Sequence, residues 1–368
     1  MSASASSRAG TEGAGVPERF KWWGWGDAAK RAEVPETTRA ALRSELGVEA
    51  REATDPAALE SVSLPAPHPI PAAVRTAAGE GGLDDGAEAR LRHAAGRSYP
   101  DLVRLRSGSL ELAPDAVATP ATREQVAALL AACAESGVAV VPYGGGSSVV
   151  GGVDALAGPH SAVLSLGLGR LRNVELDRTS LTARLGPGLR GPEAETELRR
   201  LGMTLGHFPQ SYEQATIGGY AATRSAGQAS TGYGRFDELV TAIELTAPAG
   251  AMRTLQIPHT AAGPSLRELV LGSEGTLGVI TEVGCRVRPV PEEAIYEGWM
   301  AEDFRAGAEI VRALAQEHEA PDVLRLSDEE ETRVSMVASG SGGWQRRALD
   351  AYLGVRRRRG GCLVICGY

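Results

Sequence analysis

The chain has 368 residues, and its 46 Asp and Glu residues outnumber its 38 Lys and Arg residues, which gives a formal net charge of −8. This length predicts two or three domains rather than a single core, and a hydrophobic content of 43% excludes a globally disordered chain. The acidic balance argues against a nucleic-acid-binding protein with a basic face. No apolar run approaches the roughly 20 residues that span a bilayer.

The cysteine and histidine patterns indicate the cellular compartment and whether a metal site is expected. Only four cysteines occur and no two form a CxxC pair, so the sequence predicts reduced thiols and a cytoplasmic location. No two of the six histidines stand four residues apart, which argues against a helical zinc site, and no metal is expected. Residues 1–17 lack the apolar stretch of a secretory signal and are predicted to be a disordered tail.

The N-terminal part, residues 18–112, is predicted to be mostly helical. An apolar stripe predicts a helix over 36–47, with Thr37 and Thr38 as candidate caps. Residues 60–115 are rich in Pro and Gly, and we expect a segment that wraps around neighbouring structure.

Residues 113–290 are predicted to form an α+β domain, because strands and helices alternate along them. Thr122 and Gln125 form a candidate capping box for a helix that ends at Gly137. A second helix is predicted over 193–201. Apolar and β-branched runs predict strands over 117–120, 138–142, 162–166, 174–176, 181–185, 236–246 and 278–288.

Residues 291–368 are predicted to begin a second domain, because the pattern changes after two prolines. A helix is expected over 303–318 and a strand over 323–326. The apolar run 361–368 predicts a strand that stops at the last residue, from which we expect the sequence to be cut within this domain. The four arginines at 356–359 are expected to form a solvated loop or helix end.

A glycine-rich run follows the predicted strand that ends at Pro142. Tyr143-Gly-Gly-Gly-Ser-Ser148 offers consecutive backbone N–H groups with few side chains in the way, a pattern that binds phosphate. A plain turn is the alternative, but it seldom needs three glycines followed by Gly151 and Gly152. No Gly-Lys-Ser/Thr ends the run, so it is not a Walker A loop. A side chain at Gly145 is expected to occupy the space of the phosphate and to remove freedom at positive φ.

A second glycine motif competes for the phosphate site. Gly186-Pro-Gly-Leu-Arg-Gly191 matches GxGxxG after a strand and before a helix, as in a dinucleotide-binding fold. The match is weak, because it lies far inside the chain and the acidic residue near the required distance, Glu213, stands in a polar loop. We therefore favour the run at 143–148.

Two further segments carry glycines and polar side chains. Residues 208–227 combine a Gly-Gly pair with hydroxyls and amides, which suits close contact with a planar ligand. A helix packed through small residues over 217–222 fits equally well. Residues 271–280 run from glycine-rich backbone into a β-branched strand. Together these segments predict a large phosphate-bearing cofactor that is held noncovalently, mostly by backbone.

These motifs, in this order, resemble those of the vanillyl-alcohol oxidase superfamily of FAD-linked enzymes, and the long motif Gly272-Ser-Glu-Gly-Thr-Leu-Gly-Val-Ile-Thr281 is the most specific. Phe20-Lys-Trp-Trp-Gly-Trp-Gly26 resembles the N-terminal signature of the alkyldihydroxyacetonephosphate synthases within that superfamily. The resemblance covers roughly residues 18–368. It implies an α+β fold, with a PCMH-type FAD-binding domain of two α/β subdomains over 113–290 and the start of an α+β cap domain after it.

The resemblance also implies a noncovalently bound FAD. Residues 142–148 would hold its pyrophosphate, and three further segments would line the flavin or contact the cofactor from the other side. The implied cofactor-binding residues are Pro142, Tyr143, Gly144, Gly145, Gly146, Ser147, Ser148, Gln210, Ser211, Tyr212, Glu213, Gln214, Ala215, Thr216, Thr223, Arg224, Ser225, Ala226, Glu274, Gly275, Thr276, Leu277, Gly278, Val279 and Ile280.

Arg325 resembles an arginine of the family's cap domain that matters for activity. An arginine among apolar strand residues seeks an anion such as a substrate phosphate, and an ion pair with Asp328 or Glu329 is the alternative. The family's catalytic tyrosine and histidine cluster lie beyond residue 368, so no catalytic residue is named.

Three functions follow from these observations. The first is exchange of the acyl chain of an acyl-dihydroxyacetone phosphate for a fatty alcohol, a step of ether-lipid synthesis. The second is FAD-dependent oxidation of a 2-hydroxy acid or another alcohol, and the third is a non-catalytic FAD-binding fragment. A lipid-like or other small-molecule substrate is expected and nucleic acid is not, while peripheral membrane contact and a homodimer remain open.

Overall fold

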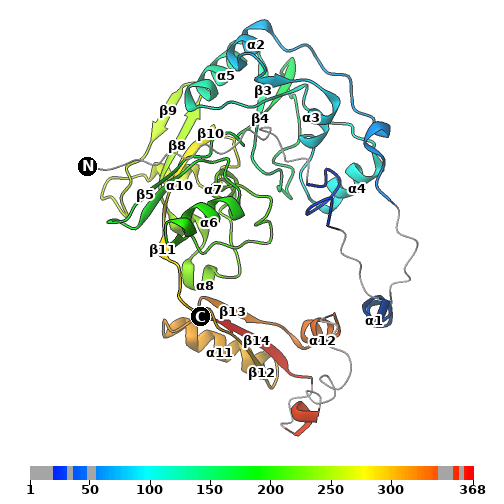
Figure 1. The fold of residues 1–368 in the computed structure, drawn as a ribbon, viewed down its shortest axis with the longest axis vertical. Coiled ribbons are helices and arrows are strands. Elements are labelled where there is room, and N and C mark those ends of the chain that lie inside the picture. The colour runs from blue at the N-terminus through cyan, green and yellow to red at the C-terminus, as the bar shows by residue number, and fades with distance from the viewer. Residues whose placement is uncertain (1–19, 31–35, 48–54, 339–350, 356–359) are drawn as a thin grey trace.

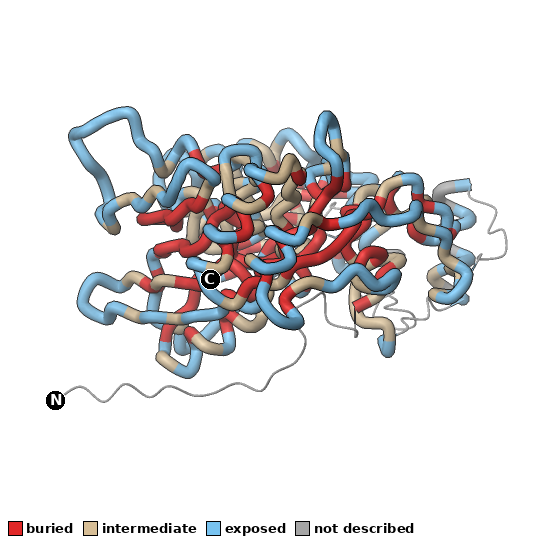
Figure 2. Tube along the Cα trace, turned by 90° about the horizontal axis from the view of Figure 1, so that it is seen from above, coloured by how far each residue is buried: buried red, intermediate tan, exposed pale blue. Residues whose placement is uncertain are grey.

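The computed structural model describes residues 20–30, 36–47, 55–338, 351–355 and 360–368. The predicted tail and the arginine run therefore lie outside the described residues. Two sheets with their helices form the upper body in Figure 1, and a smaller three-stranded sheet forms the lower one. Figure 2 shows the buried residues running through the interior of the trace, with exposed residues mainly in the outer loops.

The first sheet has the strand order β1-β2-β4-β3, formed by β1 (Leu83–Asp84), β2 (Ala116–Ala118), β4 (Ala162–Gly167) and β3 (Val138–Tyr143). Both β2 and β3 pair in parallel with β4, while β1 is antiparallel to β2. Apolar side chains of α2 (Ala72–Ala78) and α5 (Arg123–Ser136) pack with these strands into one core. β4 is buried at all six positions, as expected of a strand covered on both faces.

Thr122 caps α5 as predicted, because its hydroxyl accepts a hydrogen bond from the Gln125 N–H at 3.2 Å. The Gln125 side chain accepts from the N–H of Ala121 at 2.7 Å rather than from that of Thr122, so the reciprocal bond is displaced by one residue. Gly137, at φ 65°, ends the helix in the left-handed region.

The second sheet has the order β5-β6-β10-β8-β9 and is antiparallel throughout. A core of apolar side chains joins its strands to the neighbouring helices. Its strands are β5 (Val174–Asp177), β6 (Thr182–Leu185), β8 (Val240–Ala247), β9 (Gly250–Arg253) and β10 (Val279–Arg286), and its helices are α6 (Gly191–Arg200), α7 (Ile217–Thr223), α9 (Phe236–Leu239) and α10 (Leu266–Val270).

Two predicted strands of this sheet need correction. The strand expected over 236–246 begins at Val240, because the preceding four residues form α9, whose start is stabilised by a bond from the Arg235 N–H to the Glu238 carboxylate at 2.7 Å. The strand expected over 278–288 ends at Arg286. Beyond it, β11 (Arg288–Pro289) pairs separately with β7 (Met203–Thr204).

The N-terminal part has helices as most of its described regular structure. It contains α1 (Glu36–Leu46), the short 3₁₀ helix η1 (Leu59–Ser61), α2, α3 (Ala87–Arg92) and α4 (Tyr99–Ser107), joined by extended segments. Thr37 and Thr38 lie inside α1 and are therefore not its caps. Trp22 anchors the start of this part, since it is buried against Leu91 and Leu105.

The C-terminal sheet has the order β12-β14-β13 and is antiparallel. It comprises β12 (Tyr296–Ala301), β13 (Val323–Leu326) and β14 (Cys362–Gly367), with α11 (Phe304–Gln316) and α12 (Glu329–Ala338) beside it. The predicted strand at the end of the chain is its central strand. A bond from the Gly232 N–H in α8 (Ser230–Tyr233) to the Asp322 carbonyl, 3.2 Å long, joins this unit to the upper body. None of the helices in the described ranges is long and apolar enough to cross a membrane.

Candidate cofactor site

The glycine-rich loop leaves β3 at Tyr143 and presents a row of unused backbone donors. The N–H groups of Gly144 through Val149 donate no hydrogen bond to any residue that the structure describes. The Ser148 hydroxyl instead accepts from the N–H groups of Val150 and Gly152, at 3.4 and 3.1 Å, which shapes the end of the loop. Successive N–H groups in such a turn bind anions, so the loop suits a phosphate as predicted.

Each of the three glycines in the loop is required by a close neighbour. A Cβ built on Gly144 would lie 2.3 Å from the Thr216 hydroxyl, and one on Gly145 would lie 1.8 Å from the Gln214 carbonyl oxygen. Gly146 has a φ of +63°, and its Cβ would meet the Tyr143 hydroxyl at 1.9 Å.

This packing corrects the expected reason why residue 145 must be a glycine. A Cβ at Gly145 would collide with the protein's own backbone, before any conflict with a phosphate. Of the three glycines in the loop, the one at positive φ is Gly146.

The segment 210–216 lies against this loop, as the contacts of Gly144 and Gly145 show. Thr216 begins α7, and its hydroxyl accepts from the Gly219 N–H at 3.3 Å. Gln214 is only 4% exposed, and neither atom of its side-chain amide has a hydrogen-bond partner among the described residues. Ala215 belongs to the apolar core, so it can offer a ligand only its backbone.

The segment 271–280 also lies close to the ends of this loop, at Pro142 and Gly152. The Glu274 N–H bonds the Ala222 carbonyl at 3.0 Å, which ties the segment to α7. Gly275 has a φ of +83°, and a Cβ on it would lie 3.0 Å from the Pro142 ring. Val279 and Ile280 are buried in the core, so their side chains hold β10 in place rather than face a ligand.

Arg224 serves the scaffold. It takes a φ of +49° at the end of α7, and its guanidinium pairs with Asp237 at 2.9 Å and with Glu268 at 3.0 Å while also bonding the Leu271 carbonyl. These contacts occupy its donors. Thr223 and Ala226, on either side, are exposed and accessible to a ligand.

The structure adds a residue that the motifs did not single out, His207. Its ring is 2% exposed and lies 4.8 Å from the Tyr220 ring and 5.1 Å from the Phe236 ring. Its Nε2 atom is 3.0 Å from the hydroxyl of Ser225, one of the predicted flavin-lining residues, while Nδ1 has no partner among the described residues. Burial lowers the pKa of His207 to about 4, so the ring is neutral at pH 7.

The GxGxxG motif at 186–191 proves to be structural. Its preceding strand, β6, belongs to an antiparallel sheet, whereas a dinucleotide-binding motif follows a parallel strand. A Cβ on Gly186 would lie 2.3 Å from the Leu171 carbonyl oxygen, and one on Gly188 would lie 2.0 Å from that of Leu168. These glycines allow two chain segments to pack closely.

Arg325 lies in the C-terminal sheet and pairs with the Glu331 carboxylate, neither of the two acidic residues weighed from the sequence. Both side chains are close to half exposed. The ion pair is therefore accessible to an incoming anion, and the predicted role in phosphate binding stays a prediction.

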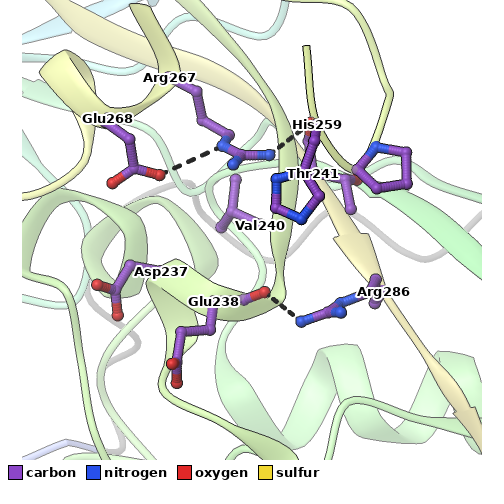
Figure 3. Close-up of a pocket in the computed structure, with 9 residues that line it drawn as sticks. Asp237, Glu238, Val240, Thr241, His259, Arg267, Glu268 and Arg286 are labelled. Atoms are coloured by element: carbon purple, nitrogen blue, oxygen red, sulfur yellow. Dashed lines mark hydrogen bonds and ion pairs between the residues drawn. The ribbon is translucent and has the colours of Figure 1, made fainter. Parts of the chain in front are cut away.

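A separate cavity of about 280 Å³ lies between α9, α10 and β8, with Arg267 and Arg286 on its wall (Figure 3). The Arg286 guanidinium donates to the Glu238 carbonyl at 2.6 Å, and Arg267 to the Thr241 carbonyl at 3.4 Å. None of the predicted cofactor residues lines this cavity. Within the described ranges, no group of His, Cys, Asp and Glu side chains could hold a metal ion.

Comparison with known proteins identifies the class. The model of the FAD binding domain family matches residues 114–256, which include β2 to β9, the glycine-rich loop and the segment 210–216. This part of the chain is therefore an FAD-binding domain of the PCMH type, and the cofactor of the protein is FAD.

The similarity extends beyond this domain. The chain is 30% identical over 355 residues to the alkyldihydroxyacetonephosphate synthase of Dictyostelium discoideum, which covers 89% of this chain and 58% of that protein. It also superposes on a solved structure of an alkyldihydroxyacetonephosphate synthase with a TM-score of 0.84 and 29% identity, over 95% of this chain and 70% of the other. It is 32% identical over 237 residues to the uncharacterized FAD-linked oxidoreductase YgcU of Escherichia coli, covering 64% of this chain and 48% of that protein. The chain thus spans little more than half the length of its first relative.

The residues of this site fit FAD. The free N–H groups at 144–149 suit a pyrophosphate, and the two flanking segments approach the loop closely enough to form the walls of one site. The unpaired amide of Gln214 in one wall is a polar group that still needs a partner.

Proposed function

We propose that this chain is the cofactor-binding part of an FAD-dependent alkyldihydroxyacetonephosphate synthase, which exchanges the acyl group of an acyl-dihydroxyacetone phosphate for a fatty alcohol. The observation that carries the proposal is the extent of the structural likeness, since 95% of this chain superposes on such a synthase, including residues outside the FAD-binding domain.

The chain's own contribution would be to bind and orient FAD. The N–H groups of residues 144–149 would hold the pyrophosphate, and residues 210–216 and 223–226 would line the flavin, with 274–280 closing the far side. Bound FAD supplies a ring system that can accept, hold and return electrons. The neutral, buried His207 would fix the Ser225 hydroxyl beside it. Arg325, on its exposed ion pair, would receive the substrate phosphate.

Incorporation of labelled fatty alcohol tests the proposal. Full-length protein with FAD, an acyl-dihydroxyacetone phosphate and the labelled alcohol should yield a labelled alkyl ether and release the fatty acid. Anaerobic addition of the same substrates should leave no permanently reduced flavin, since the exchange has no net redox change. If a protein that holds its FAD forms no labelled ether, the proposal is refuted.

FAD-linked oxidation of an alcohol or 2-hydroxy acid is the second candidate, favoured by the similarity to an FAD-linked oxidoreductase. It predicts that a 2-hydroxy acid such as lactate bleaches the flavin absorbance under anaerobic conditions. We further propose a cytoplasmic location, to be tested with a fluorescent fusion of the full-length protein.

A further inference from the structure

The tryptophan-rich segment near the N-terminus folds into a small loop. Phe20 and Asp27 form an antiparallel bridge, and the Lys21 N–H bonds the Gly26 carbonyl at 3.0 Å. Trp22 is buried in an apolar cluster of the N-terminal part, whereas Trp25 is 38% exposed. The loop is thus anchored by Trp22, with Trp23 packed against the same cluster, and Phe20 lies in a different cluster.

Phe20 packs against the base of the phosphate loop. Its side chain, 4% exposed, forms a cluster with Tyr143 and Val153. Tyr143 is the last residue of β3, and its hydroxyl donates to the Arg92 carbonyl at 2.8 Å. Because Gly146 lies so close to this hydroxyl that a Cβ could not be placed there, a shift of the Tyr143 ring would move the loop.

Cationic side chains connect the same two segments. The Arg92 guanidinium donates to the Phe20 carbonyl at 3.3 Å, and the Arg97 guanidinium to the Lys21 carbonyl at 3.5 Å. Arg97 also donates its backbone N–H to the Ser148 carbonyl at 2.7 Å, inside the loop. One residue thus links the N-terminal segment directly to the phosphate loop.

Arg190 completes this arrangement. Its side chain is buried, and its guanidinium carbon lies 5.3 Å from the centre of the Phe20 ring, within range of a cation–π interaction. Arg190 forms a bridge with Thr216, the residue that contacts Gly144. The positive charges of Arg97, Arg190 and Arg92 act to lower the pKa of the Tyr143 phenol. Burial has the larger effect, so this pKa is raised overall. Three cations therefore surround the base of a loop suited to a dianion, although Arg92 also pairs with Glu88 at 2.8 Å and Arg190 lies 4.0 Å from the Glu193 carboxylate.

We propose that Phe20 belongs to the FAD site as a positioning residue that holds both the phosphate loop, through Tyr143, and the Arg190 charge. The inference rests on the FAD-binding assignment and extends it to a segment outside residues 114–256. It predicts that FAD affinity depends on a side chain that need not touch FAD.

The test measures the Kd of FAD for the flavin-free full chain, from quenching of FAD fluorescence at several salt concentrations. Phe20→Ala should raise this Kd about 10- to 100-fold, because a loop displaced by an ångström loses much of its binding geometry. Phe20→Leu should stay within about threefold, since it keeps most of the apolar volume. Trp25→Ala is the matched control in the same loop and should leave the Kd unchanged.

Arg190→Gln provides the readout that a purely structural role would not move. It should raise the Kd about tenfold and flatten its dependence on salt, because a screened charge is removed. The double variant Phe20→Ala/Arg190→Gln should bind FAD no more weakly than Phe20→Ala alone, because Arg190 depends on the Phe20 ring for its position.

An unchanged Kd in Phe20→Ala, or additive effects in the double variant, would overturn the proposal. If circular dichroism shows that Phe20→Ala does not fold, the Arg190→Gln variant tests the proposal instead. A Kd of FAD and a salt dependence that are both unchanged in Arg190→Gln would then overturn the proposal. A wild-type chain that binds no FAD would overturn the cofactor assignment itself, and this result is distinct from the others.

Discussion

The backbone carbonyl oxygen of Gln214 lies 1.8 Å from the position that a Cβ on Gly145 would take. At this point the phosphate loop touches the backbone of the segment that precedes α7. This contact joins the end of β3, in the first sheet, to the start of a helix that packs on the second. The site is therefore built at the junction of the two subdomains.

Gly145→Ala should destabilise the protein as well as its cofactor site. Even one methyl group would push the loop from Gln214, at a cost of about 1–3 kcal/mol in the free energy of unfolding, and the displaced loop should lose FAD. Thermal unfolding of the flavin-free chain and flavin content after purification measure the two effects. Gly298→Ala, where a Cβ would lie at an ordinary 3.6 Å from Leu363, is the control. Loss of FAD without any loss of stability would contradict this reading of the contact.

Gln214→Leu should separate stability from cofactor binding. The buried, unpaired amide costs free energy in the chain without a ligand, and an apolar side chain of similar size removes that cost. We expect the free energy of unfolding of the flavin-free protein to be unchanged or higher, while FAD binds about tenfold more weakly. Gln228→Leu, at an exposed position outside the residues expected to line the flavin, should change neither. A Leu variant that binds FAD as well as wild type would remove Gln214 from the site.

Stability should fall as the pH is lowered from 6.5 to 4. Burial lowers the pKa of both His93 and His207 from 6.5 to about 4, so in this range the unfolded state binds more protons than the folded one. Each histidine then removes up to about 1.4 kcal/mol of the free energy of unfolding per pH unit, and its slope falls toward zero as the pH rises above 6.5. Urea unfolding at several pH values measures this slope.

The His93→Gln/His207→Gln double variant should reduce the slope, whereas His160→Gln, at an exposed site, should not. An identical slope in the double variant would assign the pH dependence to other groups.

Arg325→Ala should lower activity with little effect on folding. Its ion pair with Glu331 is close to half exposed and contributes less than about 1 kcal/mol. Loss of a charge-assisted contact to a substrate phosphate would cost about 1.5–3 kcal/mol, or roughly 10- to 150-fold in activity. Arg325→Lys should lose nearly as much, because lysine lacks the bidentate fork. The assay is incorporation of labelled fatty alcohol by the full-length protein, with flavin content unchanged.

Glu331→Gln is the control for Arg325, because it breaks the same ion pair but keeps the arginine. It should retain activity. Equal losses in Arg325→Ala and Glu331→Gln would show that the ion pair, and not phosphate binding, is what matters.

Acid precipitation should release the flavin into the supernatant. A covalent flavin link needs an accessible nucleophile, but the four cysteines are all buried and residues 143–148 contain neither His nor Cys. Absorbance of the supernatant near 450 nm measures the released flavin. Flavin that stays in the pellet would contradict noncovalent binding.

Local sequence patterns by themselves determined where the phosphate loop lies and most of the helices and strands around it. Three consecutive glycines after an apolar strand specify a backbone with free N–H groups, and Thr122 and Gly137 mark the ends of α5. The motif order also predicted FAD. These features depend on residues that are neighbours in the chain, so a pattern can carry them.

Only the tertiary structure decided which groups meet at the site. Three contacts illustrate this: Gly145 faces the Gln214 carbonyl, Arg224 donates to Asp237 and Glu268, and Phe20 supports Tyr143. The partners in these contacts are from 13 to more than 100 positions apart in the chain. The same reason explains the false GxGxxG motif, whose first two glycines meet carbonyl oxygens of the segment 168–171. Contacts of this kind depend on how sheets and helices pack, and no spacing within one segment records them.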